Sequence, residues 1–388
     1  MNASLETNYR KWQRTGLVAG AGGLAICMLF GFSHPARAFQ AYWFAWIFWI
    51  GIGFGGLSIQ MLQNMVQGKW GEAIARPAEA ATLTLPLMAV LFVPAWFGIP
   101  HIFPWARPGF SMHGWEHKRH YLTIGWFTLR SAAYLLTASA LAFILRRYSP
   151  KWHRHPACDP SPAVAASTLR KISAVGLVLY GLLVLFASTD WFMSLEPEWY
   201  STMPVVIVMA GDFVSALSFS IIIAIALSRT ETAEATLTVK QLHDLGNLLL
   251  AFVTFWIYVS FSQFLIIWAG DQPREISWYL HRKSGGWQYV AAALALTQFA
   301  VPFALLLSRA AKQHAHRLLP IAALIFAASI LNTYWLITPA FTPGRLRFPC
   351  VEAAAFLGIG GLWMTAFLAI LRTIGAGPVH NREEAPHV

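Results

Sequence analysis

Long apolar segments alternate with short polar segments along almost the whole chain. Most of the apolar segments have about 20 residues or more, enough for an α-helix to cross the ~30 Å hydrocarbon core of a bilayer. The pattern therefore predicts ten membrane-spanning helices, at residues 12–32, 38–64, 77–97, 120–146, 168–190, 203–228, 241–269, 286–309, 316–338 and 350–372.

The composition supports the same interpretation. Of 388 residues, 57% are hydrophobic and 12% are charged, whereas an ordinary soluble domain has ~25% charged residues. The 18 tryptophans suit a chain whose amphipathic rings sit at two membrane interfaces. We expect an all-α, polytopic integral membrane protein that forms a single membrane domain over residues 1–388. No cleaved secretory signal is expected, because the first apolar run lacks a convincing cleavage site and more spans follow it.

The formal net charge of +11 reflects membrane topology rather than nucleic-acid binding, because the basic residues lie in short loops between apolar runs. Of the 28 Lys and Arg residues, 18 lie on the side that holds both termini, nine lie on the opposite side, and Arg130 lies within span four. The positive-inside rule therefore predicts that both termini are cytoplasmic.

Two similar segments suggest an internal repeat. Gly51-x-x-x-Gly55-Gly-Leu-Ser in span two matches Gly211-x-x-x-Ser215-Ala-Leu-Ser in span six, and both spans run in the same direction. The alternative is that both are ordinary small-residue stripes for helix packing. A repeat would make two four-helix bundles from spans 2–5 and 6–9, at residues 38–190 and 203–338, flanked by spans 12–32 and 350–372.

The chain has few residues that could hold a redox cofactor. Cys27, Cys158 and Cys350 lie far apart without a Cys-x-x-Cys pair, which excludes a self-contained iron–sulfur cluster, a zinc ribbon or a covalent haem. A membrane haem needs paired axial ligands at compatible depths. Of 13 histidines, only His120 and His243 touch predicted spans, at opposite faces. We expect no haem, no metal and no catalytic residue in this chain.

Polar side chains inside the spans are the main candidates for function, because they are costly in lipid and usually face a protein interior or a water path. The candidates form three groups by depth: a cytoplasmic group of Glu79, His243, Asp244 and Asn247, a central cation, Arg130, with Tyr134 one turn further on, and an outer group of Asp190, Asp212 and Gln263.

Carboxylates and a histidine at stepped depths are what a proton relay requires, since each can hold and release a proton. Tyr258, Ser262 or water could bridge the gaps between them. Asp212 is the strongest candidate, because it is deep in its span and has no cation nearby in the sequence.

Each of the other candidates also has a structural interpretation. His243 and Asp244 could simply begin a helix at the lipid–water boundary, where an acidic first turn suits the helix dipole. Glu79 could pair with Arg76 one turn away. Arg130 could be a structural clamp for helix ends or for a carboxylate such as Asp212.

The loops on the outer side have their own character. Residues 101–120 are rich in Pro, Trp and His, and residues 189–200 are acidic and aromatic. We interpret these loops as a docking surface for an extramembrane partner. The alternative is the mouth of a quinone site, which needs an apolar slot and a protonatable partner, for which His117, His120 or Asp190 could serve.

Several motifs resemble a known family. They are Phe186-Ala-Ser-Thr-Asp-Trp-x-Met-Ser-Leu-Glu-Pro-x-Trp-x-Ser-Thr, His243-Asp-Leu-Gly-x-Leu-Leu-x-Ala-Phe continued to Trp268, His117-Lys-x-x-Tyr with Arg130 and Tyr134, and, more loosely, Gly68-x-Trp with Arg76-x-x-Glu. Over about residues 40–340 the chain is similar to the second polytopic subunit of alternative complex III, the bacterial quinol:cytochrome c oxidoreductase.

The resemblance implies a ten-span fold related to polysulfide-reductase-type membrane subunits, with two four-helix bundles, in the bacterial inner (cytoplasmic) membrane. It implies three kinds of partner besides lipid: a homologous quinol-binding membrane subunit, an iron–sulfur protein and multihaem cytochrome c subunits. Haem c and iron–sulfur clusters would belong to these partners. In this family the present subunit carries no redox cofactor and is proposed to contribute a proton route. The family pattern has a lysine where this chain has Asn247.

We therefore expect a cofactor-free membrane subunit of a respiratory quinol-oxidising complex that contributes to assembly and to a proton pathway. The alternatives are a purely structural docking subunit, a quinone-binding membrane anchor and a stand-alone secondary transporter. The transporter is disfavoured because matched pairs of Gly/Pro-interrupted half-helices are missing. Pro86 and Pro94 kink only span three.

Overall fold

The computed structural model describes residues 3–110, 116–149, 162–229 and 237–374. It is 86% helical, and these residues contain no strand. Ten helical segments are long and apolar enough to cross a membrane, which confirms the all-α polytopic fold. They are Tyr9–Ser33, Pro35–Val66, Lys69–Phe97, Ile124–Tyr148, Ala166–Leu195, Met203–Ser228, Val239–Gly270, Trp287–Leu307, Ala315–Ala340 and Cys350–Thr373.

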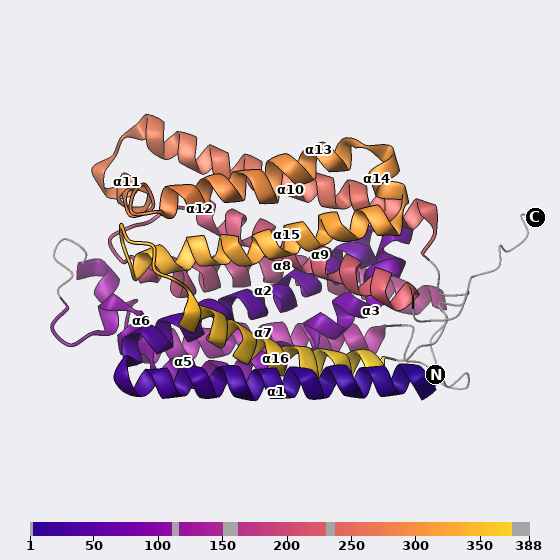
Figure 1. Cartoon of the computed structure of the whole chain (residues 1–388), viewed down its shortest axis with the longest axis horizontal. Coiled ribbons are helices and arrows are strands. Elements are labelled where there is room, and N and C mark those ends of the chain that lie inside the picture. Colours follow the sequence, from indigo (N-terminus) through magenta and orange to yellow (C-terminus); the bar gives the residue numbers. More distant parts are fainter. Residues whose placement is uncertain (1–2, 111–115, 150–161, 230–236, 375–388) are drawn as a thin grey trace, which may run out of the picture.

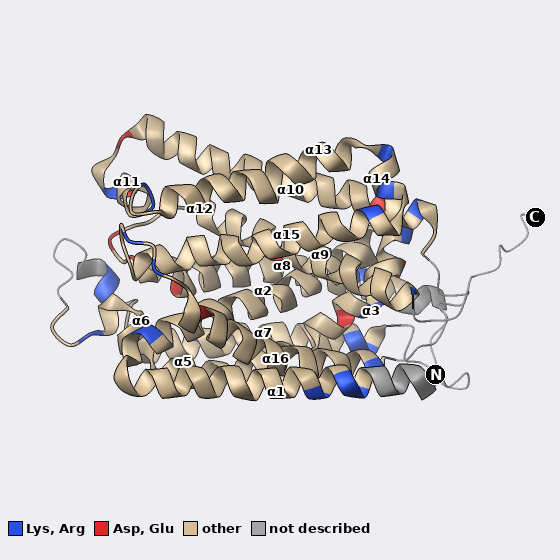
Figure 2. Cartoon of the chain, in the orientation of Figure 1, with Lys and Arg blue, Asp and Glu red and all other residues tan. Residues whose placement is uncertain are grey.

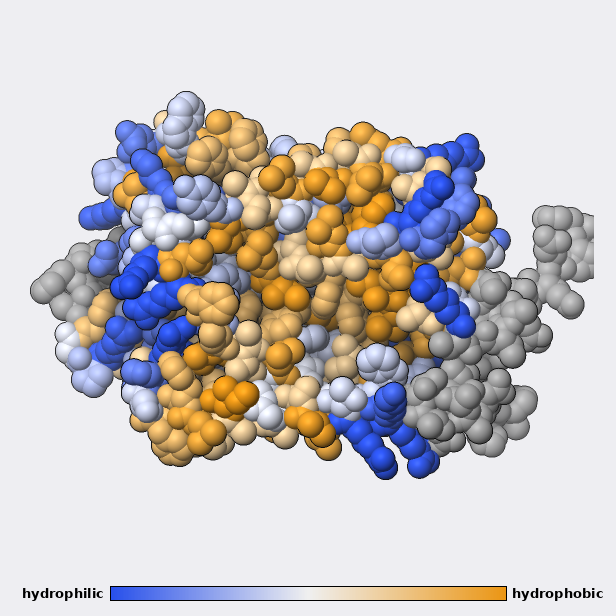
Figure 3. All heavy atoms as spheres, in the orientation of Figure 1, coloured by the Kyte–Doolittle hydropathy of each residue, from blue (hydrophilic) through white to orange (hydrophobic). Residues whose placement is uncertain are grey.

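The helices lie side by side along one direction (Figure 1). Helix α1 (Ala3–Ser33) begins and α16 (Cys350–Thr373) ends at the same end of the molecule, here called the terminal end. The short helices α6 (Ile99–Ile102) and α11 (Pro273–Leu280) lie at the other end, here called the opposite end. Most charged side chains gather at these two ends (Figure 2), and an apolar band lies between them (Figure 3). This distribution is typical of a membrane-spanning protein.

The remaining long helices follow the order of the predicted spans. They are α2 (Pro35–Val66), α3 (Lys69–Thr82), α7 (Ile124–Tyr148), α8 (Pro162–Trp191), α9 (Met203–Ser228), α10 (Val239–Gly270) and α15 (Ala315–Ile337). Shorter pieces are α4 (Leu85–Val90), α5 (Phe92–Phe97), α12 (Trp287–Leu294), α13 (Val301–Leu307) and α14 (Arg309–Gln313).

Two of the spans are interrupted. Span three breaks into α3, α4 and α5, as expected from Pro86 and Pro94, since proline lacks the N–H that continues the helical hydrogen bonds. Span eight changes from α12 to a π-helix over Ala295–Ala300 before α13. The sequence analysis missed this second break. Pro302 follows it, and a proline there cannot donate to the carbonyl one turn earlier.

Helix α2 is the central helix of the fold: 83% of its apolar stretch is buried. It packs against α9 through glycines. A Cβ added to Gly51 would collide with the Asp212 carboxylate, and one added to Gly55 would collide with the Asp212 carbonyl oxygen and the Ala216 side chain. The two segments that suggested an internal repeat therefore pack against each other, because their small residues let the helix backbones approach closely.

Indole groups hold the neighbouring helices to α2 near the opposite end. Trp43 donates to the carbonyl oxygen of Trp191 at 3.2 Å, and Trp46 donates to that of Met88 at 2.9 Å. Trp191 in turn donates to the hydroxyl of Ser131 at 2.9 Å. These bonds satisfy donors that have no water available, so they fix α4, α7 and α8 around α2.

The close approach of α2 and α9 makes a prediction about two glycines. Gly55→Ala should lower the free energy of unfolding by about 1–3 kcal/mol, because the added methyl group overpacks the contact. Gly181→Ala is the matched control: Gly181 also lies within a spanning helix, but its added Cβ meets nothing within 4 Å. Thermal unfolding of both variants in one detergent measures the difference. Equal midpoints would contradict the packing described here.

Candidate functional site

Arg130 and Asp190 form a two-pronged ion pair near the opposite end. Nε of Arg130 lies 2.7 Å from Oδ2 of Asp190, and Nη2 lies 2.9 Å from Oδ1. The Tyr134 hydroxyl also donates to Oδ2, at 2.8 Å. Arg130 further donates to the carbonyl oxygen of Tyr121 at 3.1 Å and stacks on that ring. Asp190 is 0% exposed. Arg130 is therefore a clamp that joins α7 to α8, and its partner is Asp190 rather than Asp212.

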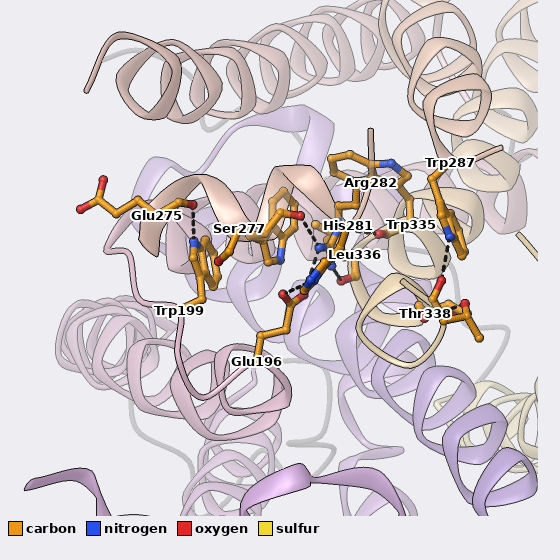
Figure 4. Close-up of polar contacts among 12 residues, drawn as sticks. Glu196, Trp199, Glu275, Ser277, His281, Arg282, Trp287, Trp335, Leu336 and Thr338 are labelled. Carbon is orange, nitrogen blue, oxygen red and sulfur yellow. Dashed lines mark hydrogen bonds and ion pairs between the residues drawn. The ribbon is translucent and has the colours of Figure 1, made fainter. Parts of the chain in front are cut away.

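A second clamp lies at the same end between the loop after α8, α11 and α15 (Figure 4). Glu196 accepts from Nη1 of Arg282 at 3.0 Å and pairs with Nδ1 of His281 at 2.9 Å. Arg282 is 3% exposed and its guanidinium lies over the Trp278 ring, 3.6 Å from the centroid. It also donates to the carbonyl oxygens of Trp278, Trp335 and Leu336, at 2.8, 3.3 and 2.7 Å.

The sequence analysis missed this second clamp. Glu196 stands in one of the family-like motifs, but Arg282 counted only as one of the outer-loop charges. Among the residues that Arg282 contacts, Trp335 and Leu336 follow it by 53 and 54 residues, and Glu196 precedes it by 86 residues. No local spacing in the sequence therefore marks the site. The aromatic residues around Trp278 were the one available signal, because a buried guanidinium often stacks on aromatic rings.

The clamp holds its charges at neutral pH. Burial raises the pKa of the Glu196 carboxyl, but the His281 hydrogen bond and the Arg282 charge outweigh burial and bring that pKa below its usual value. Burial lowers the pKa of Arg282 to about 10, against the opposing effect of Glu196. Both groups are therefore ionised near pH 7, and the pair is a permanent structural element rather than a proton carrier.

Asp212 has a different environment. It lines an internal cavity of about 60 Å³ between α2, α8, α9 and α15. In the described part of the chain, its carboxylate has no ion pair and no hydrogen bond. A water molecule needs about 10–15 Å³ of such volume, so the cavity has room for a few waters. Its other polar lining residues are Ser188, Ser215, Ser329, Asn332 and Thr333.

Small polar side chains continue from Asp212 towards the terminal end. Ser215 and Ser218 are buried on α9, and Ser58 is buried on the facing helix α2. Ser58 stands seven residues after Gly51, which corresponds to ~10 Å of helix rise beyond Asp212. Gln60 follows on α2, and its amide donates to the Thr82 hydroxyl of α3 at 3.2 Å.

The predicted cytoplasmic group lies at the terminal end, where α3 and α10 pack together. Its member on α3, Glu79, is buried. On α10, His243 and Asn247 are linked through Nδ1 and Nδ2 at 3.2 Å, and Asp244 lies 3.9 Å from His243. The ammonium of Lys312, in α14, donates to Oδ1 of Asn247 at 2.7 Å. Lys312, which the sequence analysis counted only as a loop charge, thus places a cation beside Asn247.

The remaining candidates do not join Asp212. Gln263 is buried and accepts a hydrogen bond from Ser201 at 3.1 Å. Tyr258 is 66% exposed on the outer surface of α10, so it does not bridge an internal path. His120 is exposed in a turn, and the side chain of His117 lies outside the described residues. Within the described ranges, no group of three or more His, Cys, Asp or Glu residues could hold a metal ion.

Neither a protein-family model nor a curated protein matches this sequence. The resemblance to alternative complex III therefore rests on the sequence motifs alone.

The second clamp predicts a large loss of stability when the Glu196 carboxylate is removed. Glu196→Gln leaves Arg282 buried without a counter-charge and should lower the free energy of unfolding by about 3–5 kcal/mol. Glu198→Gln is the control, since Glu198 is exposed two residues away. Chemical unfolding of the purified chain measures both. A Glu196→Gln variant as stable as Glu198→Gln would contradict the assigned role.

The clamp also predicts a pH dependence with a definite sign. The pKa of Glu196 is lower in the folded chain than in the unfolded chain. The ionised carboxylate therefore makes its full contribution to stability above about pH 4.3, and this contribution is lost as the pH falls through the lower folded pKa. Thermal midpoints measured between neutral pH and acid should therefore fall more steeply in the native chain than in Glu196→Gln. Parallel curves would contradict the prediction.

Proposed function

We propose that this chain is a membrane subunit of a respiratory quinol:cytochrome c oxidoreductase related to alternative complex III, and that it provides a proton pathway centred on Asp212. The resemblance supports the first half of this proposal. The second half is carried by one observation: Asp212 lines a small cavity between α2, α8, α9 and α15 that has room for water, and it has no ion pair in the described part of the chain.

The contrast with the two clamps favours a proton role for Asp212. A charged side chain at membrane depth costs several kcal/mol unless it is paired or hydrated. Asp190 and Glu196 are paired in this way. Asp212 instead adjoins a cavity that is large enough for water. A carboxylate beside water can accept a proton at an Oδ atom from one side and release it to another water.

The path towards the terminal end consists of groups that can support such transfer. Buried serines of α2 and α9 lead from Asp212 to the level of Gln60 and Glu79. His243, Asn247 and Lys312 form a hydrogen-bonded entrance at that end. Protons would enter there, pass by hydroxyl groups and waters, and reach Asp212.

A docking role at the opposite end accompanies the proposed pathway. The loop after α8 is tied to the loop before α7, because Lys118 donates to the carbonyl oxygen of Pro197 at 2.8 Å and lies over the Tyr200 ring. Both clamps hold helix ends near these loops. We propose that this rigid surface carries the iron–sulfur and multihaem cytochrome partners, while exposed helix faces meet the sister subunit and lipid.

A purely structural subunit is the second candidate function, because the saturated clamps favour a rigid support. A stand-alone secondary transporter would require the purified chain to move a solute by itself. A quinone-binding anchor at His120 and Asp190 has less support, because both carboxylate oxygens of Asp190 already accept hydrogen bonds within the clamp.

Replacement of Asp212 separates the proton pathway from a purely structural role. In the complex reconstituted into vesicles, Asp212→Asn should reduce the protons moved per quinol oxidised while quinol oxidation continues, because the amide keeps the volume but does not take up or release a proton near neutral pH. Asp244→Asn should slow proton entry at the terminal end. Proton uptake and quinol oxidation are measured together.

Asp271→Asn is the control, since Asp271 is exposed beyond α10 and asparagine tolerates its left-handed backbone (φ 44°). An unchanged proton stoichiometry in both Asp212→Asn and Asp244→Asn, with intact assembly, would refute the pathway and leave the structural role.

A further inference from the structure

An open groove lies at the opposite end, between the last turns of α1, the start of α2 and the loop that leads from α15 to α16 (Figure 1). Its volume is about 760 Å³. Three arginines line it, together with apolar side chains: Arg37, Arg345, Arg347, Ile26, Phe30, Leu346, Phe348 and Val351. This arginine groove takes no part in the proposed proton pathway or in the two clamps.

The positive charge of the groove is not explained by the predicted topology. The opposite side carries only nine of the 28 Lys and Arg residues, and three of these nine line this one groove. One of the three charges is compensated, because Oε2 of Glu352 lies 3.6 Å from Nη2 of Arg37. Two cations remain without a counter-charge in the described part of the chain, which favours an anionic occupant.

The loop that carries these two cations is held in place by its backbone. The N–H of Leu346 donates to the carbonyl oxygen of Gly285 at 2.8 Å. Nη2 of Arg37 donates to the carbonyl oxygen of Phe348 at 3.0 Å, and the Arg37 guanidinium lies 5.6 Å from the centroid of the Phe30 ring. Arg37 therefore braces the groove from the side of α2.

The guanidinium groups of Arg345 and Arg347 are available to a ligand. Both residues are exposed, and within the described ranges neither side chain makes an ion pair or a hydrogen bond. A guanidinium presents its N–H donors in a planar fork that matches two oxygens of one phosphate group. Two such forks on a fixed loop suit a phosphate better than they suit a single carboxylate.

The apolar wall of the groove continues into the membrane along α1. The span Tyr9–Ser33 has 25 residues. Its length of ~37 Å overruns the ~30 Å hydrocarbon core by ~4 Å at each end if the excess is shared equally. Ile26 stands ~10 Å before Ser33 and so lies within the core, and it is 58% exposed. A ligand that fills the groove must therefore be anionic at one end and apolar along its length.

We propose that the arginine groove binds an anionic phospholipid. Its phosphodiester oxygens accept hydrogen bonds from the guanidinium groups of Arg345 and Arg347, and an acyl chain lies along Ile26 and Phe30. A free phosphate would leave the apolar wall uncovered. An acidic segment of a partner protein would meet the arginines but would not cover Ile26 at its depth in the membrane.

Native mass spectrometry of the purified full-length chain in detergent tests the lipid, with phosphatidylglycerol, phosphatidylcholine of the same acyl chains, and glycerol phosphate as probes. Phosphatidylglycerol should bind about tenfold more tightly than phosphatidylcholine, and glycerol phosphate should not compete at equal concentration. The double variant Arg345→Gln with Arg347→Gln should lose this preference. The matched control, Arg107→Gln with Arg119→Gln, removes two exposed charges at the same end but outside the groove and should keep it.

The apolar wall provides a second, independent pair of variants. Ile26→Trp should weaken binding of phosphatidylglycerol several-fold, because the larger side chain occupies the path of the acyl chain. Met28→Trp is its control, since Met28 is 68% exposed on the same helix and does not line the groove. Thermal midpoints show whether each variant folds, and if the double arginine variant misfolds, the Ile26 and Met28 pair decides.

Three results would overturn the proposal: equal binding of the two lipids, equal lipid preference in the arginine variant and its control, or competition by glycerol phosphate at equal concentration. Photocrosslinking in native membranes distinguishes lipid from a partner protein. Benzoylphenylalanine in place of Leu346, which lines the groove, should form an adduct with the mass of a phospholipid. An adduct with a partner protein instead would also overturn the proposal.

Discussion

The cost of removing polar groups from water organises this protein, because each polar side chain at membrane depth needs a partner or water. Arg130 and Asp190 satisfy each other, and Glu196 satisfies Arg282. Lys312 meets Asn247 where the chain returns to the terminal end. Among these ionisable side chains, Asp212 alone has neither an ion pair nor a hydrogen bond in the described part of the chain, and α9 packs closely on Gly51 and Gly55 of α2 beside it. We propose that this unpaired carboxylate next to a cavity is the working site, in contrast with the structural ion pairs.

The polar side chains at the two ends of the molecule are paired in different ways. At the opposite end, permanent ion pairs join helix ends to aromatic loops, which makes a rigid surface. At the terminal end, the polar groups are linked by single hydrogen bonds among a histidine, an amide and an ammonium. Such groups can exchange partners more readily than a bidentate salt bridge can. The molecule thus has bidentate and buried ion pairs at the opposite end and singly hydrogen-bonded polar groups at the terminal end.

Hydropathy was enough to predict the ten spans and the break of span three, since both depend on local sequence. Where a helix carries apolar residues on every side, hydropathy does not show which side chains face the protein interior. Tyr258 was therefore expected to bridge an internal path, but it is exposed. The partner of Arg130 is 60 residues away, and Arg282 binds groups from three elements, so these contacts follow only from tertiary packing.

We propose above all that Asp212 exchanges a proton within the membrane. Infrared difference spectroscopy of the reconstituted protein tests it most directly, because a carboxylic acid has a carbonyl band that a carboxylate lacks. We predict a band that changes with pH, shifts in heavy water and is missing from Asp212→Asn but retained in Asp271→Asn. A spectrum of Asp212→Asn identical to that of the native chain would contradict the account.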